Sequence, residues 1–232
     1  MSDVLGILFD KDGTLFDFQA TWAAVTGRLL GELARGDAVL EARLAEAAGY
    51  DLGTRALRPG SIVVAHTLAE TADALLAVMP RGADRGQLIE TMLRFAQSAP
   101  QVEAVPLGPY FDRLAARGLK LGIATNDAEA AARVHLDRAG IGGAFDFVAG
   151  YDSGYGAKPA PGQLIGFCEA TGLAPETVVM VGDSGHDLIS ARAAGMRAVA
   201  VLTGLAGAEE LASGAEAVLP HIGHLPDWLD SL

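Results

Sequence analysis

The chain has 232 residues, of which 50% are hydrophobic and 20% charged, a composition typical of a globular protein with one large or two modest domains. Its formal net charge of −12, with no block of basic residues, argues against nucleic acid or an anionic membrane as a partner. No apolar run approaches the roughly 18 residues of a membrane helix, and the N-terminal segment lacks the basic region of a signal peptide, so we expect a cytoplasmic protein.

The first predicted element is a buried strand, GILF at residues 6–9, which ends in two carboxylates. Asp10 and Asp12 follow it on either side of Lys11, and Gly13 then allows a tight turn without a side chain that would block a ligand. A polar turn at the end of a strand has the same appearance. The functional interpretation therefore depends on what the rest of the chain brings to this place.

Residues 18–101 have a different composition, rich in Ala, Leu, Glu and Arg at helical spacing. We predict a helical cap inserted after the first strand, with a loop containing glycine and proline at 49–61 and one short strand-like segment at 61–65. The cap helices are predicted at 21–36, 39–49, 66–79 and 85–99. The core domain would then be discontinuous, formed by residues 1–17 and 102–232.

From residue 106 onward, short apolar segments alternate with helical patterns. Strands are predicted at 119–125, 145–150, 177–183 and 197–203, and helices at 128–140 and 162–172. This alternation is typical of an α/β protein with a mostly parallel, Rossmann-like sheet that has helices on both faces. Active sites of such sheets lie at the carboxyl ends of the strands.

Three predicted strands end in polar side chains, which meet at one edge if these strands are neighbours. These side chains are Asp10 and Asp12, Thr125 and Asn126, and Asp183, with Asp187 one helical turn further on. Carboxylates that lie close together repel one another unless a cation neutralises them. An all-oxygen site without clustered histidine or cysteine selects a hard ion, so we expect Mg²⁺ as the cofactor.

An acidic protein that binds a phosphate-bearing substrate also needs local positive charge. Lys158 is the candidate, because it lies in the loop GYGAKPAPG and not on an amphipathic helix. The hydroxyl of Thr125 and backbone N–H groups around Gly13 would add hydrogen-bond donors. When a metal and a cation offset the charges, a carboxylate such as Asp10 can attack phosphorus and form an aspartyl-phosphate.

Four segments, in order, resemble the motifs of the haloacid dehalogenase (HAD) superfamily, in its phosphatase branch with a cap between the first two motifs. They are DKDGTLFD, GIATND, GAKPAPG and VGDSGHDLISARAAG. The resemblance implies that Asp10 is the nucleophile and that Asp12 first protonates the leaving alcohol and then, as a base, activates water. It also implies two sets of ligands: Thr125, Asn126 and Lys158 for the phosphoryl group, and Asp10, the backbone carbonyl of Asp12, Asp183 and Asp187 for Mg²⁺.

The second aspartate of the first motif bears on the reaction. Dehalogenases of this superfamily lack it, because they release halide and need no proton on the leaving group, so Asp12 favours hydrolysis of a phosphoester. The sequence DKDGT also resembles a motif of P-type ion pumps, but pumps need membrane helices. Lys11, where soluble members usually have an apolar residue, is not expected to affect any of these roles.

The small cap and the sequence KPAP are most similar to those of phosphoglycolate phosphatases. We therefore expect a small-molecule phosphate ester as the substrate, namely 2-phosphoglycolate, and a monomer or homodimer. Two alternatives stay open. A phosphomutase of the β-phosphoglucomutase type would pass the same phosphoryl group to a second hydroxyl, and a binding or regulatory relative would have lost turnover.

Several other polar residues have two interpretations. The loop 49–61 offers four polar side chains that either contact the leaving group of the substrate or are solvated: Tyr50, Arg55, Arg58 and Ser61. An arginine at this place would suit a carboxylate on the substrate. Asp17 supports the hinge or faces the substrate. His186 is expected to be a surface histidine or to lie behind the residues that touch the substrate.

Overall fold

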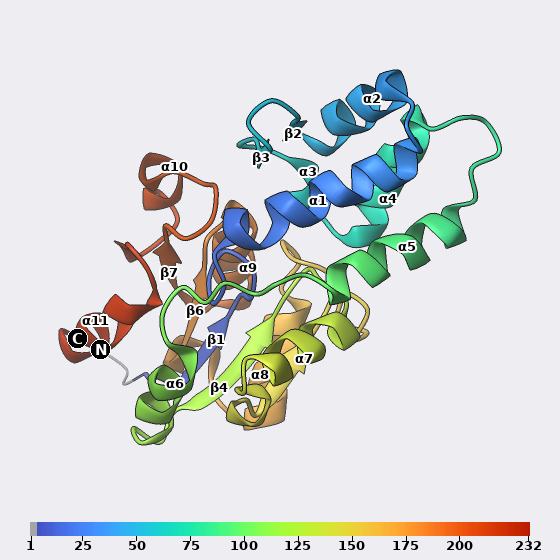
Figure 1. Cartoon of the computed structure of the whole chain (residues 1–232). Helices are drawn as coiled ribbons and strands as arrows, with labels where there is room; N and C mark the ends of the chain where they lie inside the picture. The colour runs from blue at the N-terminus through green and yellow to red at the C-terminus, as the bar shows by residue number, and fades with distance from the viewer. Residues whose placement is uncertain (1–3) are drawn as a thin grey trace.

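The computed structural model describes residues 4–232, except for the side chains of residues 64 and 65. Its centre is a six-stranded parallel sheet in the order β5-β4-β1-β6-β7-β8, which confirms the predicted α/β class (Figure 1). The strands are β1 (Gly6–Phe9), β4 (Lys120–Ala124), β5 (Phe147–Ala149), β6 (Val178–Gly182), β7 (Arg197–Val201) and β8 (Ala217–Leu219). Strand β1 is buried on both faces, which explains its continuous apolar sequence.

Helices cover both faces of this sheet. They are α6 (Leu107–Ala115), α7 (Glu129–Arg138), α8 (Gly162–Thr171), α9 (Gly185–Ala194), α10 (Ala208–Ala212) and α11 (Leu225–Asp230). On one face, Phe9 packs edge-to-face against Phe111 of α6, with 5.5 Å between the ring centroids. On the other face, Leu8 belongs to a cluster with Phe167 of α8 and Leu188 of α9. Neighbouring residues of β1 therefore contribute to two separate hydrophobic cores.

Residues 18–101, which we call the cap, form a helical layer beyond the carboxyl ends of the strands (Figure 1). Its elements are α1 (Phe18–Ala34), α2 (Ala38–Ala48), β2 (Tyr50–Asp51), β3 (Ala56–Leu57), α3 (Ile62–Ala65), α4 (Leu68–Val78) and α5 (Arg85–Gln97). The four long helices begin at residues whose side chains accept hydrogen bonds from the first turn, namely Asp17, Asp37, Thr67 and Asp84. They share a core of their own that includes Leu30, Leu44 and Leu75. The domain boundaries at 17 and 102 stay a prediction.

Two local expectations for the cap are wrong. The strand-like segment 61–65 is largely the short helix α3, because the Ser61 hydroxyl accepts a hydrogen bond from Val63 N–H and caps the helix. The predicted loop 49–61 contains the antiparallel hairpin of β2 and β3. Asp51 shapes its turn, since its carboxylate accepts hydrogen bonds from the backbone N–H groups of residues 53 and 54.

The two segments that connect the cap to the sheet domain lie side by side and are joined by backbone hydrogen bonds. Asp17 N–H donates to the Val102 carbonyl at 2.8 Å, and Ala104 N–H donates to the Leu15 carbonyl at 2.9 Å. The Asp17 side chain accepts from Ala20 N–H at 2.8 Å and caps α1. Asp17 therefore supports the crossing, in agreement with the structural interpretation of this residue.

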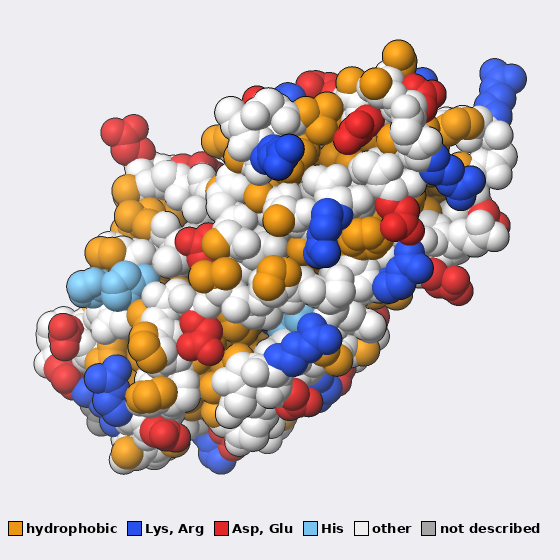
Figure 2. Space-filling view, in the orientation of Figure 1, with side chains coloured by type: hydrophobic (Ala, Val, Ile, Leu, Met, Phe, Trp, Pro, Cys, Tyr) orange, Lys and Arg blue, Asp and Glu red, His pale blue; other side chains and the backbone are white. Residues whose placement is uncertain are grey.

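On the face shown in Figure 2, acidic and basic side chains are interspersed and do not form a single basic patch. None of the helices within residues 4–232 combines the length and apolar character that crossing a membrane would require. The expectation that nucleic acid is not a partner stays a prediction.

Candidate active site

The three strands whose ends carry the predicted site residues are neighbours in the sheet. Phe9 of β1 pairs with Ile123 of β4 on one side and with Val181 of β6 on the other. Asp10 follows directly, and its N–H donates to the Val181 carbonyl at 2.8 Å. Because the three strands are parallel and in register, the side chains that follow them lie at one edge of the sheet.

Three carboxylates from this edge form a compact acidic cluster. One oxygen each from Asp10, Asp183 and Asp187 lies within 4.8 Å of the others. The Lys158 ammonium lies 2.8 Å from Asp10 Oδ1 and 2.6 Å from Asp187 Oδ1. The second oxygen of Asp187 accepts hydrogen bonds from the N–H and hydroxyl of Ser184 at 3.0 and 2.7 Å. Asp187 therefore caps α9 and faces the cluster at the same time.

Burial makes this cluster electrostatically unfavourable without a further cation. Burial raises the pKa of Asp10 to about 6, and Asp187 adds to this effect while Lys158 opposes it. Burial, together with Asp10 and Asp187, also raises the pKa of Asp183 well above its usual range. For Lys158, the attraction of Asp10 and Asp187 outweighs burial and raises the pKa of the ammonium. The donor set, three buried carboxylates against one lysine, fits a hard divalent cation such as Mg²⁺.

Two glycines allow the backbone to approach Asp183 closely. A Cβ atom at Gly13, where φ is +79°, would lie 2.3 Å from Asp183 Oδ2, and one at Gly204 would lie 1.7 Å from the same oxygen. The Thr203 hydroxyl donates to the Gly13 carbonyl at 2.6 Å and ties the two segments together. The sequence analysis missed residues 203 and 204, whose only signal is the short glycine-containing segment after β7.

The N–H of Gly13 does not face the acidic cluster. It donates to the Phe16 carbonyl at 2.8 Å within the turn. The expectation that backbone N–H groups around Gly13 bind the phosphate stays a prediction. The strict requirement for glycine here comes from the positive φ and from the Asp183 carboxylate, not from an approaching ligand alone.

The carboxylate of Asp12 points to a different set of partners. Trp22 Nε1 of the cap donates to Asp12 Oδ1 at 2.8 Å, and the Lys11 ammonium contacts Asp12 Oδ2. Among the described residues, the group that could hold a metal comprises Asp10, Asp183 and Asp187 without the Asp12 carboxylate. This arrangement separates the side chain of Asp12 from the metal-binding oxygens. Metal binding by its backbone carbonyl stays a prediction.

Lys11 is fully buried and lies at the centre of a network that the sequence analysis did not foresee. Besides Asp12, its ammonium lies 3.5 Å from Asp127 Oδ2 and 3.1 Å from His135 Nδ1. Burial, with the charge of Lys11 acting in the same direction, lowers the pKa of His135 to about 4. A neutral His135 can donate from Nε2 to the Ala96 carbonyl at 2.9 Å while Nδ1 accepts from Lys11.

The predicted phosphate ligands lie beside the acidic cluster. Thr125 follows β4 and is 2% exposed, and its N–H donates to the Ala149 carbonyl at 3.0 Å. The Asn126 amide accepts from Lys158 N–H at 2.8 Å and donates to the Lys158 carbonyl at 2.9 Å. Asn126 therefore holds the backbone of Lys158 in place. Direct contact of Thr125 or Asn126 with phosphate stays a prediction.

A cavity of about 120 Å³ connects this cluster to the interior of the cap. Asp10, Asp12, Thr125, Asn126 and Lys158 all line it, whereas Asp183 and Asp187 do not. The four side chains of the cap loop do not line it: Tyr50, Arg55, Arg58 and Ser61. His186 does line it, and its ring lies 5.9 Å from the ring of His66 of the cap, measured between centroids. His186 thus lies at the cavity and not on the surface away from it.

Residues 4–195 match the family model of haloacid dehalogenase-like hydrolases. The chain belongs to this family. A phosphoglycolate phosphatase of Neisseria meningitidis is 31% identical over 99% of this chain and 94% of its own length. A phosphoglycolate phosphatase of Rhodospirillum rubrum is 36% identical over 116 residues, half of this chain, and the match spans 48% of that relative.

Solved structures share the fold of this HAD-like hydrolase. A predicted phosphoglycolate phosphatase from Haemophilus somnus superposes with a TM-score of 0.76 and 17% identity, covering 98% of this chain and 99% of that one. An L-2-haloacid dehalogenase from Xanthobacter autotrophicus superposes with a TM-score of 0.65 and 21% identity over 99% of both chains. Since proteins described by different reactions share this fold, the reaction has to be argued from the site.

The raised pKa of Asp10 leads to a prediction about metal binding by this HAD-like hydrolase. A ligand carboxylate must be ionised, so below about pH 6 a Mg²⁺ ion bound by Asp10 would have to displace a proton from this side chain. We expect the apparent Mg²⁺ affinity to increase as the pH rises from about 5 to about 7, with net proton release. Calorimetric titrations in two buffers of different ionisation enthalpy measure both quantities. An affinity that is constant over this pH range would contradict the assignment of Asp10 as a ligand.

Proposed function

We propose that the protein is a Mg²⁺-dependent phosphatase that hydrolyses a small phosphomonoester through an aspartyl-phosphate on Asp10. The observation that carries the proposal is the pairing of Lys158 with both Asp10 and Asp187, where Lys158 and Asp10 line the polar part of a cavity. A phosphoryl group that enters there would meet a carboxylate nucleophile and a buried ammonium together. The names of the relatives favour the same class of reaction.

In the proposed mechanism, a carboxylate oxygen of Asp10 attacks phosphorus and the bond to the leaving oxygen breaks. Asp12 gives a proton to that oxygen and then accepts a proton from the water that attacks the aspartyl-phosphate. This second attack breaks the bond between phosphorus and the Asp10 oxygen, so that inorganic phosphate leaves and the Asp10 carboxylate is restored. Lys158 and the Thr125 hydroxyl hold the phosphoryl oxygens, and Asn126 fixes the backbone of Lys158. Asp10, Asp183, the Asp12 carbonyl and Asp187 would hold Mg²⁺, which would supply charge stabilisation for the phosphoryl oxygens.

The position of Asp12 supports its role as the proton carrier. Its carboxylate lines the cavity beside Asp10, but Lys11 and Trp22 hold it away from the metal-binding oxygens. Trp22 belongs to the cap, so the position of Asp12 depends on contact between the cap and the core. Closure of the cap over a substrate would thus complete the site.

The proposal is tested by metal-dependent release of phosphate from p-nitrophenyl phosphate. We expect nitrophenol and inorganic phosphate in equal amounts, loss of turnover after treatment with EDTA, and recovery when Mg²⁺ is added. Turnover that survives complete removal of divalent ions would contradict the metal-dependent mechanism. Conversion of β-glucose 1-phosphate to glucose 6-phosphate without release of phosphate would instead favour the phosphomutase.

A further inference from the structure

The cavity has two chemically different ends. Every described residue that lines it from the sheet side is polar, and the cation among them is Lys158. Among the described cap residues that line it, twelve of fifteen are apolar, and they include Phe18, Val25, Leu29, Leu75, Met92 and Phe95. The phosphate end is therefore polar, and the end that would hold the leaving alcohol is largely apolar.

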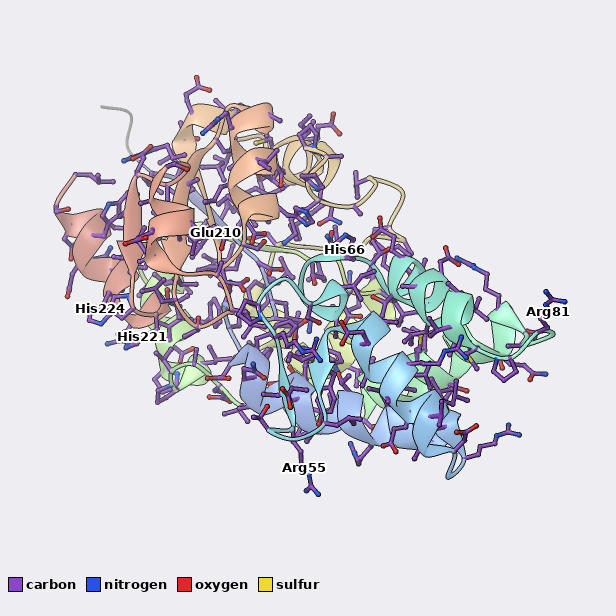
Figure 3. The ribbon with its side chains drawn as sticks, turned by 90° about the horizontal axis from the view of Figure 1, so that it is seen from above. Arg55, His66, Arg81, Glu210, His221 and His224 are labelled. Carbon is purple, nitrogen blue, oxygen red and sulfur yellow. The ribbon has the colours of Figure 1, made fainter. Side chains whose placement is uncertain are left out.

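Within the described part of the cap, no lysine or arginine lines this cavity. Arg58 forms an ion pair with Glu46 at 2.9 Å on the surface. Arg55 lies in the β2–β3 hairpin and points away from the molecule in Figure 3, whereas His66 lies near the middle of that view. The arginines that the sequence offered for a substrate carboxylate are therefore directed away from the place where it would lie.

The remaining basic side chains near the cap interior cover it from outside. The guanidinium groups of Arg28 and Arg94 lie 6.0 and 5.8 Å from the ring centroid of Phe95, and Arg94 also pairs with Glu32 at 2.8 Å. Phe95 lines the cavity, but neither of these arginines does. They extend the apolar wall without placing a charge in it.

The polar exceptions in the cap part of the lining are Thr26, Thr71 and His66. Thr71 donates its hydroxyl to the Thr67 carbonyl at 3.1 Å, so it is engaged within its own helix. His66 lies against His186, and both histidines line the cavity. A buried carboxylate needs a paired cation, whereas an apolar group needs only to displace water from this wall.

We infer that the leaving alcohol of the substrate is apolar, a short alkyl or single-ring group that occupies the cap end of the cavity, and not glycolate. The inference rests on the proposed phosphatase function and names the substrate class of the same site. The volume of about 120 Å³ covers both ends of the cavity, and an apolar cavity of about 150 Å³ holds one benzene ring, so the leaving group has to be small. The expectation of 2-phosphoglycolate as substrate becomes the competing outcome of the test.

The test compares a homologous series of alkyl phosphates, from methyl to pentyl phosphate, with 2-phosphoglycolate. The straight-chain alcohols from ethanol upward have nearly equal acidity, so differences along this part of the series report binding of the alkyl group and not leaving-group chemistry. We expect kcat/KM to rise about fourfold for each added methylene until the cavity is full. The best alkyl phosphate should exceed 2-phosphoglycolate by roughly tenfold or more.

Variants test whether the preference for longer alkyl chains depends on the cap residues that line the cavity. Met92→Ala should move the optimum to a longer alkyl chain, because it enlarges the apolar end of the cavity. Val39→Ala is the matched control, since Val39 is 72% exposed and lies outside the cavity. Arg55→Ala and Arg58→Ala should leave the turnover of 2-phosphoglycolate unchanged, and His66→Leu should not lower it selectively.

Binding provides a second measurement that does not depend on turnover. Alkylphosphonates, which cannot be hydrolysed, should bind the Mg²⁺-loaded protein about fourfold more tightly for each methylene when measured by calorimetry. A flat series in both assays, or a preference for 2-phosphoglycolate that depends on His66, Arg55 or Arg58, would overturn the inference.

Methyl phosphate separates this inference from the proposed function. Its alcohol is too small to fill the apolar end, so its Mg²⁺-dependent and Asp10-dependent hydrolysis tests the phosphatase alone. If methyl phosphate is hydrolysed and the series is flat, the function stands and the apolar leaving group is wrong. If no ester is hydrolysed, the proposed function fails and the inference fails with it.

Discussion

Asp10→Asn is expected to abolish phosphate release, with kcat lower by about 10³-fold or more, because the amide cannot act as the nucleophile. The side chain keeps nearly the same shape, so Lys158 retains its second partner, Asp187, at 2.6 Å. Release of inorganic phosphate from p-nitrophenyl phosphate with saturating Mg²⁺ measures the loss. Mass spectrometry of rapidly quenched enzyme should show a phosphoryl adduct on the wild type and none on the variant.

The control for this prediction is Asp37→Asn. Asp37 caps α2 at the surface, and asparagine is an equally good cap, so activity and stability should stay unchanged. Without metal, Asp10→Asn should unfold at the same or a higher temperature than the wild type at neutral pH, because it removes one charge from a buried acidic cluster. A variant that folds but keeps wild-type turnover would remove Asp10 from the mechanism.

The sequence was sufficient to predict the strands of the sheet and the acidic residues that follow them, because both are marked by short-range patterns. Apolar segments at 119–125 and 177–183 are strands, and the motif residues follow them directly, so their convergence required only that β4, β1 and β6 be neighbours. That adjacency depends on chain topology, and the structure confirms it. Asp10, Asp183 and Asp187 therefore lie together as expected.

The contacts that escaped prediction depend on tertiary packing, one between cap and core residues ten positions apart and one between residues more than a hundred positions apart. Trp22 reaches Asp12 across the gap between cap and core, and His135 reaches Lys11 from a helix more than a hundred residues later. No local pattern marks either residue, since Trp22 and His135 have the spacing of ordinary helix residues. The segment 61–65 failed for a different reason: its valines favour a strand, but the Ser61 cap outweighs this local propensity.

Lys11→Met is expected to lower the free energy of unfolding by about 3–5 kcal/mol, because it leaves Asp127 buried without its cation. Burial already raises the pKa of Asp127 to about 6, and the Lys11 charge is the main effect that opposes this. For a chain of this length, such a loss lowers the melting temperature by roughly 10 °C. Chemical denaturation monitored by circular dichroism measures the free energy, and calorimetry measures the melting temperature.

Loss of Lys11 should also lower the rate of the reaction, because its ammonium and Trp22 Nε1 both donate to the Asp12 carboxylate. We expect kcat to fall by roughly tenfold to a hundredfold at a temperature where the variant is folded. Lys120→Met is the matched control, since Lys120 pairs with Asp146 at the surface and should contribute less than about 1 kcal/mol. Adding Asp127→Asn to Lys11→Met should restore a large part of the stability, since it removes the unpaired charge, but not kcat, because Asp12 still lacks its second donor. Restoration of both, or of neither, would show that Lys11 does not act through these two carboxylates separately.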